Sequence, residues 1–225
     1  MPSAQPFRAL AIATATLMVG ASAHAEFFGN SQGGTDFPQG VSSFADVVAS
    51  YDPVIKSGQP TEPNRQPNTG IGKPDYPGSG SNFSVTLGDG GSITLEFVDN
   101  RLTGSGDSKA DLWIFEVGPD VEDTFVEISK DGSTWSAVGK VFGSTASINI
   151  DAFGFSQTDQ FRFVRLTDDT NEGDQSGASV GADIDAVGAI SSVVAPPPAI
   201  PEPETYALML AGLALVGAAA RRRRA

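Results

Sequence analysis

Apolar and polar residues alternate along much of the chain between residues 83 and 190, and this period of two predicts β-strands. In SITLEFV, residues 92–98, Ile93 and Leu95 lie on one face of the predicted strand and Thr94 lies on the other. The same pattern predicts strands in FSVTL (83–87), FVEIS (125–129), SINID (147–151), FRFVRLT (161–167) and ADIDAVGAI (182–190). Because the body shows no helical period over ten residues, we expect an all-β sandwich of Greek-key or jelly-roll type.

Two further patterns refine this sandwich. DLWIFEV, residues 111–117, is apolar on both faces, which is typical of a central strand. Asp131 and Gly132 predict a hairpin turn before Trp135. FADVVASY, residues 44–51, fits a strand or a short helical turn, and we favour the strand.

Two segments of the body lack a periodic apolar pattern. Residues 26–43 are polar and glycine-rich, so we expect them to be irregular. Residues 52–82 hold six prolines and five glycines, which predicts a long loop. The sandwich domain is therefore expected over residues 44–190, followed by a proline-rich linker over 191–200.

The N-terminal residues 1–25 predict a signal peptide. Arg8 supplies a positive charge, an apolar stretch of 12 residues follows, and Ala23 and Ala25 flank His24 as a cleavage site for signal peptidase. A permanent N-terminal anchor is the alternative, but the apolar stretch is short for a membrane span. The general secretion machinery would then export a mature chain beginning at residue 26.

The C-terminal residues 201–225 combine three parts. Pro201, Glu202 and Pro203 come first, an apolar run covers residues 206–220, and four arginines follow at 221–224. At about 1.5 Å per residue the run makes a helix of roughly 22 Å, shorter than a hydrocarbon core of roughly 30 Å. We expect a short transmembrane helix that holds the chain in the membrane, with the arginines on the cytoplasmic side.

Composition excludes many functions for the exported body, residues 26–200. Of the 14 basic residues, five lie in the two ends, and of the 27 acidic residues, two do, so the body carries 9 − 25 = −16 formal charges. Nucleic acid and anionic lipids are poor partners for such a surface, and divalent cations are good ones. The chain has no cysteine, and its single histidine, His24, lies in the signal peptide, so histidine-dependent and thiol catalysis is excluded.

The most suggestive acidic pair is Asp183 and Asp185. Residues two apart on a strand face the same side, so both carboxylates would point together and favour a cation between them. Calcium prefers six to eight oxygen ligands, and further oxygens are available from Asp75, Asp107 and Asp111. We therefore predict a calcium site from these five aspartates. The alternative is that the pair lies on the solvent face and pairs with an arginine of FRFVRLT.

Aromatic side chains provide candidate ligand contacts. Tyr51 and Tyr76 flank the long loop, and Trp135 follows the predicted hairpin, so these three are candidates to stack on a ligand. For Trp135, packing in the core is an equally good alternative. Trp113 lies in a strand that is apolar on both faces, where packing in the core is the better interpretation. The acidic loop at 167–179 is either a solvated loop or the wall of a ligand site.

The three C-terminal parts, in this order, resemble the PEP-CTERM sorting signal of Gram-negative bacteria. The resemblance implies recognition by an exosortase, a membrane-embedded peptidase, near Pro201, Glu202 and Pro203. It also implies an intermediate anchored in the inner membrane, followed by transfer to the cell surface or an extracellular matrix.

A second resemblance covers roughly residues 44–190. VEISKDGSTWSAVG (126–139), FRFVRLTDD (161–169) and GADIDAVGAI (181–190) are similar, in this order, to strands of discoidin-like, galactose-binding-type jelly rolls. Proteins of this fold mostly bind glycans or other surface ligands at loops on one end of the sandwich, and they often hold a structural calcium ion.

These observations lead to three hypotheses. The leading one is a non-enzymatic surface or matrix protein that binds exopolysaccharide through a calcium-stabilised β-sandwich. The second is an acidic structural component of the matrix without a specific ligand. The third is a glycan-active enzyme, which needs two carboxylates across a cleft, with Glu96 and Glu116 as the strand glutamates available. We expect no enzyme.

Overall fold

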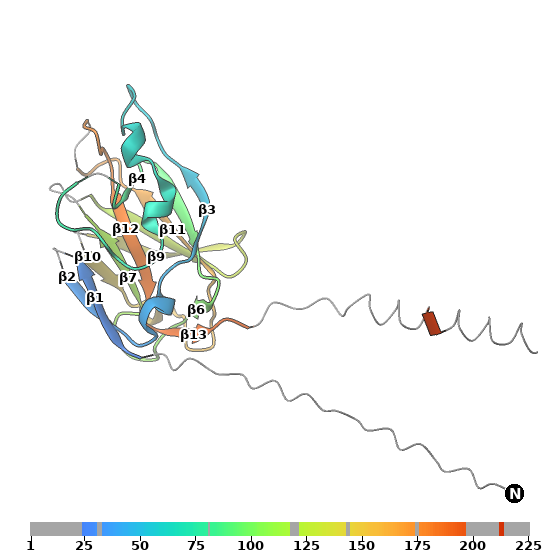
Figure 1. Cartoon of the computed structure of the whole chain (residues 1–225). Coiled ribbons are helices and arrows are strands. Elements are labelled where there is room, and N and C mark those ends of the chain that lie inside the picture. The colour runs from blue at the N-terminus through green and yellow to red at the C-terminus, as the bar shows by residue number, and fades with distance from the viewer. Residues whose placement is uncertain are drawn as a thin grey trace, which may run out of the picture.

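The computed structural model describes residues 24–30, 33–80, 82–117, 122–142, 145–173, 176–196 and 212–213 (Figure 1). Most of the signal peptide, including Ala23, lies outside the described residues, as do Pro201, Glu202 and Pro203. Of the predicted C-terminal helix, only residues 212 and 213 are described, and both are helical. No helix within the described part of the chain has the length and apolar character needed to span a bilayer.

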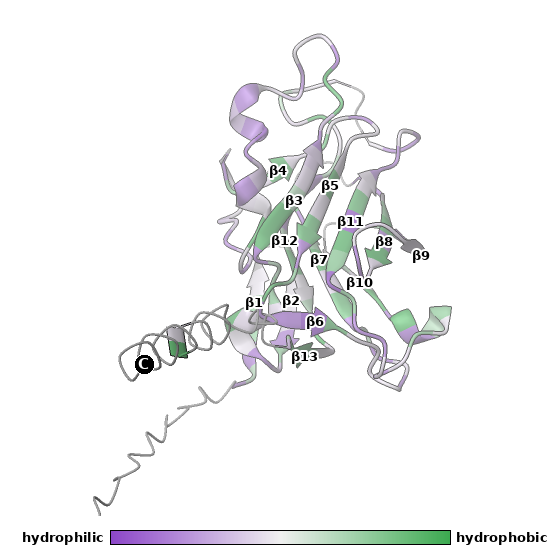
Figure 2. Ribbon diagram, turned by 90° about the vertical axis from the view of Figure 1, so that its right-hand side faces the viewer, coloured by the Kyte–Doolittle hydropathy of each residue, from purple (hydrophilic) through white to green (hydrophobic). Residues whose placement is uncertain are grey.

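Two antiparallel sheets form the body of the protein, and this arrangement confirms the all-β prediction. One sheet has the order β10 (Thr145–Ile148), β7 (Leu112–Glu116), β12 (Asp183–Ala189) and β4 (Val85–Thr86). The other has the order β3 (Val47–Asp52), β5 (Ser92–Glu96), β11 (Phe163–Asp168), β8 (Thr124–Ser129) and β9 (Trp135–Val141). Figure 2 shows β3, β5, β11 and β8 side by side.

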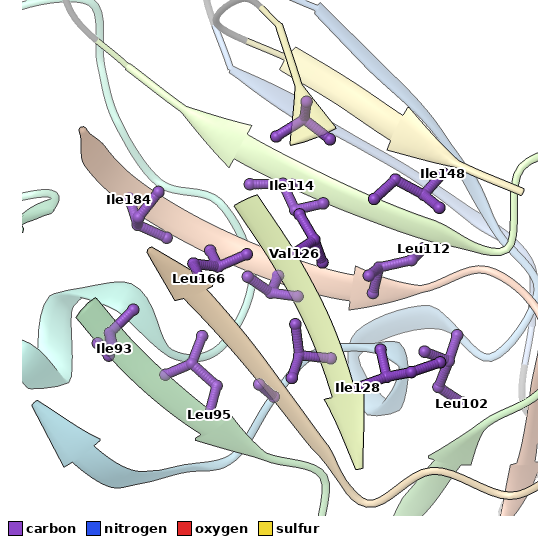
Figure 3. Packing of buried hydrophobic residues seen from close by; sticks show 14 of the residues in the cluster. Ile93, Leu95, Leu102, Leu112, Ile114, Val126, Ile128, Ile148, Leu166 and Ile184 are labelled. Atoms are coloured by element: carbon purple, nitrogen blue, oxygen red, sulfur yellow. The ribbon is translucent and has the colours of Figure 1, made fainter. Parts of the chain in front are cut away.

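The main core lies between these two sheets (Figure 3). The inward residues of β5, β8 and β11 follow the predicted alternation, and β7 and β12 supply the opposite wall. The fully buried side chains include Ile93, Leu95, Leu112, Ile114, Val126, Ile128, Leu166 and Ile184. Because β7 lies between β10 and β12 and is apolar on both faces, the prediction of a central strand is confirmed.

The expectation that residues 26–43 are irregular is wrong. They form a hairpin of β1 (Glu26–Asn30) and β2 (Gly33–Phe37), followed by a 3₁₀ turn at Gly40–Ser43. Phe28 and Phe37 of the hairpin pack with Phe44 against Phe115, on the outer face of the four-stranded sheet. The burial of these aromatic rings outweighs the weak strand propensity of a glycine-rich sequence.

The hairpin and the long loop together bury β12 along its whole length. One face of the strand contacts the main core; on the other, Ala186 and Gly188 lie under the aromatic rings of the hairpin, and Asp185 is bonded to the loop at residues 75 and 76. The outer face of the five-stranded sheet differs, because Val47 and Phe125 on it are 43% and 45% exposed. The hairpin therefore covers part of one outer face of the sandwich, and the other outer face remains in contact with solvent.

The long segment between β3 and β4 contains two 3₁₀ turns, Glu62–Asn64 and Pro67–Gly70, and no strand among its described residues, as predicted. A further 3₁₀ turn, Ile150–Phe153, follows β10. The long segment is tied to the acidic loop, since the backbone N–H of Thr61 donates to the carbonyl of Ala178 at 2.9 Å.

The predicted linker at 191–200 begins too early. Residues of β13 (Ser192–Val194) pair with β6 (Asn100–Leu102), and the N–H of Ala195 donates to the carbonyl of Asp99 at 2.8 Å. The amide of Gln39 also donates to the carbonyl of Ser192 at 2.8 Å. The N-terminal hairpin and the departure point of the C-terminal segment therefore lie at the same end of the sandwich (Figure 1).

Candidate ligand-binding surface

The five aspartates of the predicted calcium site do not converge. In the antiparallel pair of β7 and β12, Leu112 lies opposite Ala189 and Glu116 lies opposite Ile184. Asp111 and Asp183 consequently lie at opposite ends of the pair, roughly 20 Å apart at about 3.3 Å per residue. Asp107 lies in the loop that precedes Asp111, where it bonds to Ser105 and Lys109. The prediction of one site from all five residues is therefore wrong.

Asp75 and Asp185 are brought together, but through the backbone of the loop. The N–H groups of Asp75 and Tyr76 donate to the two carboxylate oxygens of Asp185 at 3.1 and 3.4 Å. The register of β12 shifts between residues 184 and 186, which interrupts the alternation on which the prediction for Asp183 and Asp185 rested. The buried Asp185 thus anchors the long loop to the sheet.

Asp183 belongs to a different group of buried carboxylates. Its side chain accepts a hydrogen bond from the hydroxyl of Thr86, and its N–H donates to Glu116 at 3.4 Å. Burial raises the pKa of Asp183 to about 7 and, together with Glu122 and Asp183, raises the pKa of Glu116 to about 9. These two carboxyl groups therefore stay protonated at pH values well above those at which ordinary carboxyl groups ionise.

The alternative pairing of Asp183 and Asp185 with arginine is also wrong, because both arginines of FRFVRLT pair elsewhere. Arg162 binds Glu96 and Arg165 binds Glu127. Among the described residues, no group of three or more His, Cys, Asp or Glu side chains is arranged to hold a metal ion. Calcium binding stays a prediction, without the ligand set expected for it.

The two tyrosine candidates differ in their surroundings. The hydroxyl of Tyr51 donates to the carbonyl of Thr86 at 2.6 Å, and burial raises the pKa of Tyr51 to about 12. Tyr51 packs against the main core, so its interpretation as an exposed ligand contact is wrong. Tyr76 is half-buried beside Asp185, and its role as a ligand contact stays a prediction.

Trp135, the third candidate, lies on the exposed outer face of the five-stranded sheet beside an open pocket of about 360 Å³. The pocket is lined by Ala49, Ser50, Thr94, Gly132, Trp135, Phe163 and Arg165. Four strands and the turn between β8 and β9 contribute to this lining. Trp113, by contrast, packs against the aromatic cluster under the hairpin, as expected.

The pairing of the strands explains how residues distant in sequence meet at this pocket. Residues directly opposite one another form rows across the outer face. The Trp135 row comprises Val47, Glu96, Phe163, Ser129 and Trp135; the Arg165 row comprises Ser50, Thr94, Arg165, Glu127 and Ala137. Because alternate residues of each strand face the same side, these two rows are neighbours on one surface.

Arg165 is held firmly at the pocket. Its Nε and Nη2 atoms donate to Oε2 of Glu127 at 2.8 and 2.6 Å, and its guanidinium carbon lies 4.2 Å from the centroid of the Trp135 ring. The arginine therefore carries an ion pair and a cation–π contact together, and it fixes the orientation of the indole.

The turn completes the pocket. Gly132 adopts a φ of +75°, a conformation that favours glycine, and a Cβ atom there would lie 3.4 Å from the ring of Phe163. Asp131 accepts hydrogen bonds from the N–H groups of Ser133 and Thr134, each at 2.8 Å. The turn spans the five residues 130–134 and positions Trp135 over the sheet.

The pocket region is electrically balanced in an acidic protein. The two rows with the adjoining Arg162 hold two arginines and two glutamates, each paired with the other kind. The body as a whole carries 9 − 25 = −16 formal charges, so its excess negative charge lies elsewhere. A ligand of this face does not need to be a cation.

Comparison with known proteins identifies the C-terminal segment. Residues 199–224 match the family model of the PEP-CTERM protein-sorting motif, which confirms that resemblance. The motif marks an exported protein that is sorted through the membrane and processed by exosortase, a membrane protein. No curated protein sequence matches the chain.

Two solved structures are similar to the sandwich. One is the C-terminal domain of a chitobiase from Bacteroides fragilis, with 14% identity, 69% of this chain and 97% of that chain covered, and a TM-score of 0.41. The other is CpGH89CBM32-6 produced by Clostridium perfringens, with 15% identity, 47% and 72% covered, and a TM-score of 0.31. At these scores the similarity carries no functional argument.

Proposed function

We propose that this exported protein is a non-enzymatic component of the cell surface or extracellular matrix that binds exopolysaccharide through the outer face of its five-stranded sheet. The observation that supports this most strongly is the open pocket between Trp135, Phe163 and Arg165 on the exposed face. On the four-stranded sheet, by contrast, the aromatic rings of the N-terminal hairpin pack on the outer face at Phe115 and Ala186.

The side chains at the pocket suit a sugar ligand. The C–H faces of a sugar ring pack on aromatic rings, and its hydroxyls need donors and acceptors nearby. Trp135 and Phe163 supply the rings, and Ser50, Thr94 and Arg165 line the same pocket, which brings two hydroxyl-bearing residues and a guanidinium group to it. A small number of polar groups among apolar ones is characteristic of ligand sites.

The positions of the two strand glutamates support a non-enzymatic function. Glu96 lies on the outer face of the five-stranded sheet and is paired with Arg162. Glu116 lies in the other sheet, is 1% exposed, and has a pKa raised to about 9 by burial. A glycosidase needs two carboxylates flanking one bond, and these two belong to different layers.

The point where the C-terminal segment leaves the sandwich fits presentation of this face from a membrane-bound intermediate. The last paired residue, Ala195, lies only a few residues before the sorting motif at 199–224. Exosortase processing then transfers the sandwich to the surface or matrix. The binding face is a lateral face of the sandwich, away from the end at which the C-terminal segment departs.

Retention of the mature protein on immobilised exopolysaccharide from its own host tests the proposal. Trp135→Ala removes the indole from the pocket, and we expect about tenfold weaker binding, or about 1.4 kcal/mol. Phe27→Ala is the matched control, because Phe27 is an aromatic residue, 64% exposed, on the N-terminal hairpin. Equal weakening by both variants, or by neither, would contradict the proposal.

The charge of −16 on the body supports a second candidate function, a structural matrix component that associates through bound divalent ions. The same experiment separates the two. A component of that kind shows non-saturable retention that changes with salt and chelator and that is unaffected by Trp135→Ala, whereas a specific site saturates.

A further inference from the structure

A second aromatic group lies on the same outer face, beyond the Arg165 row. The next row comprises Asp52, Ser92, Thr167, Phe125 and Lys140. Phe125 is 45% exposed, and Phe142, at the end of β9, is 69% exposed. Large exposed aromatic rings next to one another are unusual on a soluble surface unless they contact a partner.

Lys140 holds these two rings. Its ammonium nitrogen lies 5.5 Å from the centroid of Phe125 and 5.2 Å from that of Phe142. It is also paired with Asp123 at 2.7 Å and with Asp169. A lysine fixed by two carboxylates restrains both rings, so a ligand that stacks on them meets a surface that is already ordered.

A β-bulge aims this lysine at the outer face. Phe125 lies opposite Lys140 and Glu127 lies opposite Ala137, so β9 contains one residue more than β8 over this interval. Gly139 within the bulge has a φ of +105°, and a Cβ atom there would lie 3.2 Å from the ring of Phe153. The extra residue restores the outward direction of Lys140 after the inward Val138.

The two aromatic groups are separated by a fixed distance along the strands. Ser129, opposite Trp135, and Phe125 are four residues apart on β8, which corresponds to roughly 13 Å at about 3.3 Å per residue. The Arg165 row lies between them and presents hydroxyl, guanidinium and carboxylate groups. A single sugar ring cannot reach both aromatic groups, but an extended chain of several rings can.

We propose that the outer face recognises the interior of an extended polysaccharide chain lying along the strands, with sugar rings on Trp135 and Phe163 at one end and on Phe125 and Phe142 at the other. This inference rests on the proposed function and specifies its ligand. The middle row contacts the hydroxyls of the intervening rings. The site thus binds several consecutive sugars within a chain, and a single terminal sugar occupies only part of it.

Oligosaccharides of graded length, prepared by partial hydrolysis of the host exopolysaccharide, test this inference by calorimetry with the mature protein. We expect affinity to rise with length until one chain covers both aromatic groups and then to level off. Phe125→Ala is expected to weaken binding of the long chains about tenfold and to leave the shortest bound fragment unaffected. Phe27→Ala serves as the control, and thermal melts verify that each variant is folded.

The outcomes distinguish this inference from the proposed function. If the shortest fragments bind as tightly as the longest, or if Phe125→Ala has no effect on long chains, the extended-chain site is wrong and the pocket at Trp135 still stands. If no fragment and no polymer binds, both are wrong. Phe125→Leu keeps an apolar side chain without the ring, so a folded Phe125→Leu variant that also loses the length dependence supports stacking specifically.

Discussion

Asp185 shows how a single residue can suggest one role by sequence and have another in the structure. Its position two residues after Asp183 predicts a shared cation site, yet both of its oxygens accept backbone N–H groups from the long loop. A buried carboxylate bonded in this way stabilises the irregular backbone that it holds. Asp185 of β12 therefore anchors the long loop at residues 75 and 76.

Replacement of Asp185 should destabilise this anchor. We expect Asp185→Ala to lower the free energy of unfolding by about 1–3 kcal/mol, because two backbone donors lose their acceptor. Asp185→Asn should lose less, since its amide oxygen still accepts. Thermal melts in calcium and in chelator check this: the loss should be the same in both, and a loss seen only in calcium would instead assign Asp185 to a calcium site.

Glu116 makes stability depend on pH. Its pKa is raised to about 9 by burial among other carboxylates, so its contribution to stability is complete below its ordinary pKa of 4.5 and is lost as pH rises towards 9. Asp169 acts in the opposite sense, because its hydrogen bond to Lys140 lowers its pKa to about 2 and its contribution is lost as pH falls below 3.8. Stability should be greatest at mildly acidic pH.

Melting curves at pH 5 and pH 9 test this. We expect the wild type to melt at a lower temperature at pH 9. Each unit of pKa shift corresponds to about 1.4 kcal/mol in the free energy of unfolding. Glu116→Gln keeps the shape of the side chain without its charge and should reduce the difference, while the exposed Glu172→Gln should not. Equal pH dependence in all three proteins would contradict the assignment to Glu116.

At the scale of the elements, the hairpin β1–β2 determines which face of the sandwich is free. Its contact with β12 is close, because a Cβ atom on Gly188 would lie 2.5 Å from the ring of Phe37 and 2.9 Å from that of Phe44. Only glycine at this position lets the rings approach the strand. The covering of this part of the four-stranded sheet depends on this packing.

Gly188→Ala should displace the hairpin. The added methyl group overpacks the aromatic cluster, and we expect a loss of about 1–3 kcal/mol in the free energy of unfolding. Phe37→Leu removes part of the ring that the methyl meets, so the double variant should recover some of this loss. Urea unfolding of the four proteins measures the coupling, and strictly additive losses would show that residues 37 and 188 do not interact.

The sequence predicted the elements whose pattern is local. β5, β8 and β11 alternate cleanly, β12 was expected from its alternation, and β7 is apolar on both faces, so these strands could be inferred from the local pattern alone. The hairpin β1–β2 could not, since its strands have five residues each, include glycines, and are stabilised by contacts with residues 115 and 186. The short β6 and β13 were missed for the same reason.

The candidate site was only partly predictable. Trp135 was singled out because it follows a turn signal, and in the structure it lines the pocket on the outer face; its role as a ligand contact stays a prediction. Its neighbours Phe163 and Arg165 come from a strand that looked structural, and their meeting with Ser50 depends on the pairing of four non-consecutive strands. The ligand set predicted for calcium was wrong for a related reason, because the register that separates Asp111 from Asp183 is not visible in the sequence.

In the whole molecule, the C-terminal segment concerns sorting and the outer face of the sandwich concerns the proposed binding. The sorting motif at 199–224 marks an exported protein that is sorted via the membrane. The segment that leads to it leaves the sandwich at the same end as the N-terminal hairpin. The strongly acidic body resists non-specific association with anionic material, while the balanced outer face permits contact with a glycan. The account therefore depends on whether that face binds exopolysaccharide.

Tryptophan fluorescence of the mature protein tests this claim most directly. The chain has two tryptophans, so Trp113→Phe leaves Trp135 as the single reporter at the pocket, and Trp135→Phe leaves Trp113 as a control under the hairpin. Titration with host exopolysaccharide should give a saturable change in the emission of Trp135 and none in that of Trp113. A signal that does not saturate, or that appears equally at both residues, would contradict binding at the outer face.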